Sequence, residues 1–421
     1  MVKMEIISKE SIKPSSPTPD NLRTFGLCLF DQFFPPFFSI PLIFYYSHES
    51  TSHVEQADIS SLLKRSLSDA LSLYYPFAGR MKDASSVHCD DQGVDFLEAR
   101  VDTRLSEAIE PPKVELLNQL VPSRSEEGGG VLLAIQLSYF ICGGIAIGMS
   151  ICHTVADGCA FSMFVKAWAA MARGDANMVV APSFATSSLF PPRDSFGLQT
   201  SYESSKYSGE TRRFRFSSSK IAALRDEVGA RTAVQPTRVQ LVTAVIWKWA
   251  MARKGCDRCL PSFVWYPVNV RGRINPPLSE NTFGNAIWRE KMSGNGEMDL
   301  GELVSKIREA VRKIDSEYLE ELQGENVNEK LVRDTKKVME LFVDNEVDYF
   351  LITSWCRFPF HESDFGWGKP VWVSTASWGF SNMVVLIDSM SDIGGIEAWI
   401  TMDEVEKFED EAQLLAFDSG T

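Results

Sequence analysis

One stretch near the middle of the chain most constrains the fold, because an apolar hairpin runs there into a polar junction and then into a helix. Residues 132–137 and 145–151 are mainly apolar runs of strand length, and the Cys-Gly-Gly sequence at 142–144 predicts a turn between them. Apolar residues then recur at helical spacing, at Phe161, Phe164, Val165 and Trp168. We therefore expect His153 to end a buried strand and Asp157 to lie in the first residues of the helix.

The spacing of His153 and Asp157 admits three interpretations. In the first, His153 is a core histidine with a satisfied hydrogen bond and Asp157 caps the helix. In the second, the pair belongs to a metal site, but such sites usually need three or four ligands and the other histidines form no matching cluster, so no metal is expected. In the third, His153 is a general base, because an imidazole titrates near neutral pH and can take a proton from a hydroxyl group. The pair alone leaves the choice open.

Three further segments carry a family resemblance. They are Leu-Tyr-Tyr-Pro-Phe-Ala-Gly-Arg at 73–80, Thr-Ser-Trp-Cys-Arg at 353–357, and Asp-Phe-Gly-Trp-Gly-Lys-Pro at 364–370. Together with His-x-x-x-Asp-Gly at 153–158, they give a chain that resembles the plant acyl-coenzyme A-dependent acyltransferases of the BAHD family over nearly its whole length. The Lys-Pro that ends the last segment is similar to the branch that acetylates alkaloids and terpenoids.

The resemblance implies an α/β fold of two chloramphenicol-acetyltransferase-like domains. Each has a mixed β-sheet flanked by helices, and the active site lies in a channel at the domain interface. We expect residues 1–185 to form an acceptor-side domain, 186–210 a crossover loop, and 211–421 a coenzyme A-side domain, with 364–388 completing the N-terminal sheet. The length of 421 residues independently favours two domains.

The expected chemistry needs one base, because a thioester is already electrophilic and its thiolate leaves readily. His153 would take the proton of the acceptor hydroxyl. The resemblance implies that the indole of Trp355 donates to the oxyanion and that Thr353 assists, although Trp355 could also be a buried strand aromatic. Asp157 could orient the imidazole, but the resemblance implies a structural ion pair with Arg271.

The Asp-Phe-Gly-Trp-Gly segment is expected to be a structural loop. Gly366 and Gly368 permit a tight turn, Trp367 packs, and Asp364 holds the loop. The alternative is that Asp364 is a second base.

The co-substrate implied by the resemblance is acetyl-CoA, and no permanently bound cofactor is expected. Its phosphates need donors, and Thr237, Arg238, Lys248 and Arg273 lie on or near helix starts of the second half. Such cations on helices also commonly face solvent, so both interpretations stay open.

The acceptor is expected to enter a pocket walled by aromatic side chains near the N-terminus. Phe30, Phe34 and Phe38 are the candidates, and some phenylalanines of this cluster are expected in the core. A wide aromatic pocket suits a polycyclic alcohol, such as an alkaloid or terpenoid, better than a sugar or a charged amine.

The charge and composition of the chain limit the kinds of partner that we expect it to bind. The formal charge of −14 and the lack of a basic cluster exclude a nucleic-acid partner. The eight scattered cysteines suit reduced packing residues, and no apolar run reaches the roughly 18 residues of a membrane span. We expect a monomeric, cytosolic protein without a membrane partner. Two alternatives remain: an acyltransferase for other donors or for simple or phenolic alcohols, and a non-catalytic relative that binds a metabolite.

Overall fold

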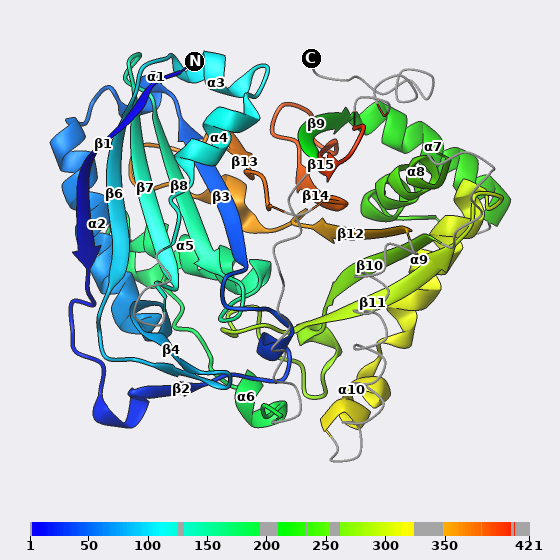
Figure 1. The fold of residues 1–421 in the computed structure, drawn as a ribbon, viewed down its shortest axis with the longest axis horizontal. Helices are drawn as coiled ribbons and strands as arrows, with labels where there is room; N and C mark the ends of the chain where they lie inside the picture. The colour runs from blue at the N-terminus through cyan, green and yellow to red at the C-terminus, as the bar shows by residue number, and fades with distance from the viewer. Residues whose placement is uncertain are drawn as a thin grey trace. The chain divides into compact units, whose positions relative to one another are not determined.

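The structure is a computed structural model, and its chain forms two compact units (Figure 1). Unit 1 contains the described residues up to 193, together with 278–286 and 358–378, and unit 2 contains the others. Each unit has a six-stranded mixed sheet flanked by helices, which confirms the predicted fold class. The described residues are 2–124, 130–193, 209–232, 235–252, 262–323, 348–379, 381–405 and 408.

The main sheet of unit 1 has the strand order β1-β6-β7-β8-β3-β13. Only β6 and β7 run parallel in it. Every residue of β7 and β8 is buried, as their nearly continuous apolar sequences predict for central strands. The strands are β1 Met4–Ile12, β3 Ser39–Tyr46, β6 Val94–Val101, β7 Leu133–Phe140, β8 Ile145–Cys152 and β13 Trp372–Ser374, and a small second sheet contains β2 Thr24–Gly26, β4 Arg80–Asp83 and β5 Ser86–His88.

Helix α5 is the central helix of unit 1, and it is apolar on nearly all sides, as a fully buried helix should be. It packs against α2, where the indole N–H of Trp168 donates to the hydroxyl of Ser66 at 3.1 Å. Figure 1 shows the two helices beside the sheet. The helices are α1 His48–Thr51, α2 Gln56–Leu73, α3 Leu105–Ile109, α4 Val114–Leu120, α5 Gly158–Ala172 and α6 Thr186–Leu189.

The boundaries of the units differ from the expected ones in two places. Residues 278–286 belong to unit 1, because their backbone is bound there by buried carboxylates. Of the expected segment 364–388, only the part up to 378 belongs to unit 1, where β13 pairs with β3. Residues 383–388 form β14 of unit 2, since they pair with its strands on both sides. Most of the expected crossover, 194–208, lies outside the described residues.

The sheet of unit 2 has the order β11-β10-β12-β14-β15-β9, with β12 parallel to both of its neighbours. One face carries Val264, Ile352 and Val384, which join α7, α8 and α9 in a single apolar core. Because side chains alternate along a strand, Thr353 lies on the opposite face. The elements are β9 Glu210–Phe216, α7 Ser218–Thr232, α8 Arg238–Ala252, β10 Ser262–Asn269, β11 Ile287–Gly294, α9 Leu300–Lys313, α10 Ser316–Gln323, β12 Asp348–Ser354, β14 Met383–Asp388 and β15 Ile396–Met402.

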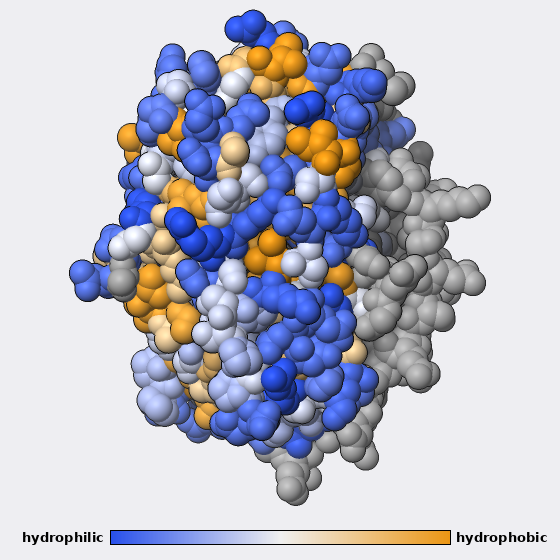
Figure 2. All heavy atoms as spheres, turned by 90° about the vertical axis from the view of Figure 1, so that its left-hand side faces the viewer, coloured by the Kyte–Doolittle hydropathy of each residue, from blue (hydrophilic) through white to orange (hydrophobic). Residues whose placement is uncertain are grey.

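The surface of unit 1 on the side of α2 and β1 is mainly hydrophilic (Figure 2). Hydrophobic side chains appear on this face in small groups among polar ones, which is ordinary for a folded domain in water. Within the described ranges, no helix has the length and apolar character needed to cross a bilayer.

Candidate active site

His153 follows the last residue of β8, as the sequence predicts, and is held against an aromatic segment. Its backbone N–H donates to the carbonyl of Phe38 at 2.9 Å. Its imidazole stacks on the ring of Phe34, with centroids 3.7 Å apart and planes 9° apart, while the ring of Phe38 lies 5.3 Å away. The residue is 8% exposed. The imidazole is thus fixed at the end of a rigid strand with one face covered.

The carbonyl of His153 is held by Asn285, a residue that the sequence did not indicate. The Nδ2 group of Asn285 donates to His153 O at 2.7 Å and to Asp31 Oδ1 at 2.8 Å. Asp31 also accepts from the backbone N–H of Asn285 at 2.8 Å and of Cys28 at 2.6 Å. Desolvation raises the pKa of the fully buried Asp31 to about 6, even though these hydrogen bonds act in the opposite direction. A carboxylate, an amide and the main chain of His153 therefore form one buried network.

Asp157 is the N-cap of α5, and both of its carboxylate oxygens bind backbone. Oδ1 accepts from the N–H of Ala160 at 2.8 Å, and Oδ2 accepts from the N–H of Ala286 at 2.9 Å. The residue thereby ties 278–286 to the start of α5. Its expected partner, Arg271, is a buried residue of unit 2 whose backbone N–H donates to Oδ1 of Asn269 at 3.1 Å. An ion pair between Asp157 and Arg271 stays a prediction.

Two of the three predicted pocket phenylalanines lie at His153. Phe34 and Phe38 contact its ring, and Trp378 makes an edge contact with Phe38 at a centroid distance of 5.6 Å. Phe30 is fully buried and packs on Phe190 at 4.7 Å, so it is a core residue. The aromatic side chains around His153 are therefore Phe34 and Phe38, with Trp378 packed against Phe38.

Asp364 organises the glycine-rich loop of unit 1. Its Oδ1 accepts from the N–H groups of Gly366 at 2.8 Å and Gly368 at 2.9 Å. Both glycines have positive φ, +117° and +102°, a conformation that other residues adopt only with strain. Between them, Trp367 stacks on Phe365, which is itself buried against Trp168. These contacts are those of a structural loop.

Thr353 and Trp355 lie at the end of β12 in unit 2. Trp355 directly follows the strand, is buried, and donates its backbone N–H to the carbonyl of Leu386 at 2.7 Å. Burial raises the pKa of the next residue, Cys356, to about 12, so its thiol is protonated at neutral pH. Cys356 is therefore a poor nucleophile.

The four predicted phosphate ligands all have structural partners within unit 2. Nη1 of Arg273 donates to the carbonyls of Val311 and Ile314 at the end of α9, at 2.8 and 2.7 Å. Arg238 binds Asp388 at 3.0 Å. Lys248 and Thr237 are similarly engaged: Lys248 donates to the carbonyls of Gly296 and Met298, and Thr237 accepts the N–H of Gln240 at the start of α8. Their binding of coenzyme A stays a prediction, and part of their donor capacity is already used.

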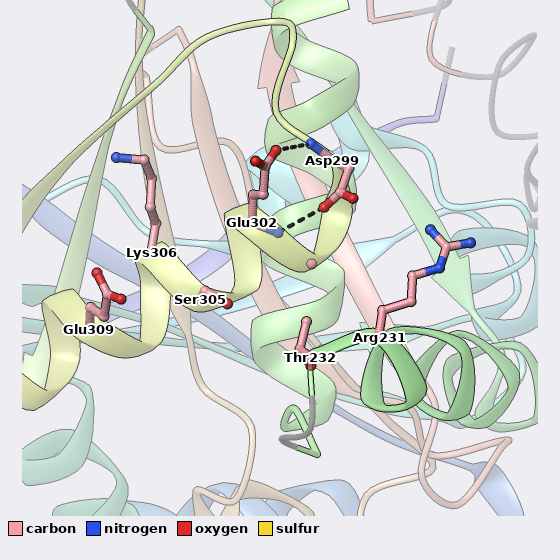
Figure 3. A pocket seen from close by; sticks show the side chains of 8 residues that line it. Arg231, Thr232, Asp299, Glu302, Ser305, Lys306 and Glu309 are labelled. Carbon is pink, nitrogen blue, oxygen red and sulfur yellow. Dashed lines mark hydrogen bonds between the residues drawn. The ribbon is translucent and has the colours of Figure 1, made fainter.

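A pocket of about 440 Å³ lies in unit 2 between the last turn of α7 and the first turns of α9 (Figure 3). Arg231, Asp299 and Lys306 are among its lining residues, and Asp299 forms a capping box with Glu302. None of its lining residues belongs to the predicted site, so it has no part in the candidate active site. In the part of the chain that the structure describes, no three His, Cys, Asp or Glu side chains are grouped as metal ligands.

The chain matches the sequence profile described as the Transferase family over residues 2–415. It is 36% identical to limonoid 1-O-acetyltransferase of Citrus sinensis over 446 residues, with 99% of each chain covered. It is also 36% identical to stemmadenine O-acetyltransferase of Catharanthus roseus, and this match covers 99% of this chain and 96% of that one.

Solved structures match along nearly the whole chain as well. Vinorine synthase is 33% identical and superposes with a TM-score of 0.81 over 99% of both chains. TRI101 of F. sporotrichioides, solved in complex with coenzyme A and T-2, has a TM-score of 0.68 over 94% of this chain and 98% of that one. At 15% identity, this second match shows the fold alone.

Proposed function

Because the chain belongs to the plant BAHD family of acyl-CoA-dependent acyltransferases, we propose that it transfers acetyl from acetyl-CoA to a hydroxyl of a polycyclic plant metabolite, with His153 as the base. The observation that carries the proposal is the placement of His153. Its imidazole ends a central strand, lies flat on Phe34, and is fixed through both its backbone N–H and its backbone carbonyl. Such a ring is held still for proton transfer.

In the proposed reaction, both substrates are bound at once. A ring nitrogen of His153 takes the hydroxyl proton as the alcohol oxygen attacks the thioester carbon, and the carbonyl oxygen becomes an oxyanion. The C–S bond then breaks, and the coenzyme A thiolate receives the proton from the imidazolium. The ester and free coenzyme A leave, and the enzyme returns to its starting state without a covalent intermediate. General-base catalysis of this kind contributes about 10²- to 10⁴-fold in rate.

The oxyanion requires a hydrogen-bond donor, and we assign this role to the indole of Trp355 with assistance from Thr353. An indole N–H can only donate, and its hydrogen bond to the charged oxyanion is stronger than its hydrogen bond to the neutral thioester carbonyl. One such donor is usually worth about 10²- to 10³-fold in kcat.

The acceptor class is supported by the aromatic side chains beside the base. Phe34 and Phe38 lie against the ring of His153, and Trp378 packs on Phe38. An acceptor bound at His153 would therefore meet aromatic side chains, which suits a polycyclic alcohol. Relatives named for limonoid and stemmadenine acetylation point to terpenoid and alkaloid acceptors. We further propose that the protein is a monomer in the cytosol and that it holds no cofactor between turnovers.

The test is release of free thiol from acetyl-CoA by the purified protein, with and without alcohols. The panel contains stemmadenine, a limonoid alcohol, shikimate and 1-hexanol. We expect thiol release that depends on a polycyclic alcohol and a product heavier by one acetyl group. Preference for shikimate would overturn the acceptor class, release without alcohol would indicate a hydrolase, and no release with any alcohol would favour a metabolite-binding relative.

A further inference from the structure

The side chain of Asn285 joins two distant parts of unit 1 to the main chain of His153. It lies 132 residues from His153 and 254 residues from Asp31, yet its Nδ2 is within 2.8 Å of an oxygen of each. Asn285 and Asp31 are both fully buried. The network is thus built from side chains that folding brings together, away from solvent.

The orientation of the Asn285 amide follows from the acceptors around it. Nδ2 faces Asp31 Oδ1, the carbonyl of His153, and, at 3.4 Å, the carbonyl of Thr154. The two N–H bonds of the amide point to the two nearer acceptors, Asp31 Oδ1 and the carbonyl of His153. The flipped amide would place its own oxygen against three acceptors, so only the observed orientation gives the N–H groups of the amide their partners.

We propose that Asn285, itself held by the carboxylate of Asp31, is a positioning residue that sets the placement of His153 for proton transfer. This inference rests on the proposed function, because it concerns the geometry of the base. The N–H of His153 is fixed by the carbonyl of Phe38, and its carbonyl by Asn285, so the backbone of the residue is held on both sides.

Without the amide, the carbonyl of His153 loses its buried donor and the residue can rotate about the end of β8. The imidazole must lie within hydrogen-bond distance of the acceptor hydroxyl, and a displacement of about 1 Å can lower the rate about 100-fold. The effect should appear in kcat, because Asn285 contacts the base rather than either substrate. KM should change little.

The main test is Asn285→Ala, with kcat and both KM values measured on the best acceptor of the panel above. We expect kcat to fall about 10- to 100-fold and each KM to stay within about threefold. In protein labelled at histidine, the Cε1–H signal of His153, identified by its absence in His153→Ala, should shift. A kcat within twofold of the parent in a folded variant would overturn the proposal.

Thr186→Val is the matched control. Thr186 is also buried, and its hydroxyl donates to the carbonyl of Phe283 at 3.1 Å, two residues before Asn285. The variant removes one hydrogen bond from the same segment without touching the His153 network. We expect unchanged kcat and an unchanged His153 signal. A fall in kcat as large as that of Asn285→Ala would show that general loosening of the segment is the cause, and the proposal would be lost.

A double variant separates this inference from the proposed function. In a His153→Ala background, Asn285→Ala should lower the residual rate no further, because the base through which Asn285 acts is gone. A further loss by the same factor would mean that Asn285 acts elsewhere. If His153→Ala alone retains the parent rate, the proposed function fails, whereas an inactive His153→Ala beside a fully active Asn285→Ala removes only the positioning role.

If Asn285→Ala fails to fold, Asp31→Asn tests the same hydrogen-bond network with less loss of side-chain volume. It leaves Asn285 in place but replaces the charged acceptor that orients its amide. We expect kcat to fall about 3- to 10-fold with unchanged KM values. An unchanged kcat in that variant would contradict the proposed relay from Asp31 through Asn285.

Discussion

The ring of Phe34 lies 3.7 Å from the imidazole of His153, and their planes are within 9° of parallel. The stack is held by a hydrogen bond beside it, because the hydroxyl of Thr154, the residue after His153, donates to the carbonyl of Phe34 at 2.9 Å. The lone pair of an imidazole nitrogen lies in the ring plane, so an aromatic ring stacked on one face does not lie in the direction from which that nitrogen would take a proton. The stack therefore restrains the imidazole of His153 from a side that the proposed proton transfer does not use.

Asp157 is expected to act on stability before it acts on chemistry. Asp157→Ala removes the cap of α5 and the acceptor of the Ala286 N–H, which together should cost about 2–4 kcal/mol of unfolding free energy. Asp157→Asn keeps a capping oxygen and should recover part of the loss. Denaturant unfolding and kcat measured on both variants test this. A stable Asp157→Asn whose rate falls as far as that of His153→Ala would instead assign the carboxylate to the imidazole.

The buried carboxylate of Asp31 should make stability depend on pH. Its pKa rises from 3.8 to about 6 on folding, so the folded protein binds this proton more tightly than the unfolded chain. The resulting contribution is complete below pH 3.8 and is lost as pH rises through about 6; a pKa difference of this size corresponds to about 3 kcal/mol. We predict that the unfolding free energy of the parent, relative to Asp31→Asn, falls by this order between pH 4 and 7. A difference that is flat in pH would refute the shift.

The predicted oxyanion role of Trp355 has a simple kinetic signature. Trp355→Phe keeps a buried aromatic ring but removes the donor, so kcat should fall about 10²- to 10³-fold with little change in either KM. Trp247→Phe is the control, since it removes another buried indole donor of unit 2, one that binds Ser262 at 3.0 Å. Equal rates for the parent and Trp355→Phe would remove this residue from the mechanism.

Asp364 should behave as a loop anchor rather than as a second base. Asp364→Ala frees the N–H groups of Gly366 and Gly368, and we expect a loss of about 2–4 kcal/mol in stability. At a temperature where the variant is folded, its kcat should match that of the parent. Thermal unfolding monitored by circular dichroism, alongside the thiol assay, checks both statements. A normal melting temperature combined with a lost rate would support the catalytic alternative.

Local patterns in the sequence predicted the elements that carry His153. The apolar runs, the turn and the helical spacing gave β7, β8 and α5 because each depends on neighbours a few residues away.

The contacts that hold His153 could not be predicted in the same way. Asn285 meets Asp31 across 254 residues, and short-range periodicity contains no information about such a pair. The available signal was a single carboxylate, Asp31, inside an apolar N-terminal run, where an ionisable group must find buried partners.

The predicted phosphate ligands illustrate a related difficulty. All three cations were expected on or near helix starts, but only Arg238 begins a helix, because Lys248 lies near the end of α8 and Arg273 ends the short turn 271–273. Each donates to groups of unit 2 that are distant in sequence. Charge and position in the sequence alone do not distinguish a cationic side chain that binds a ligand from one that forms structural hydrogen bonds with a loop.

The central claim is that His153 takes the proton of the acceptor alcohol, and His153→Ala tests it most directly. The variant should stay folded at the assay temperature and lose about 10²- to 10⁴-fold in alcohol-dependent thiol release from acetyl-CoA. His88→Ala, which changes a half-exposed histidine, should keep the full rate. A folded His153→Ala protein that retains more than about a tenth of the parent rate would contradict the account.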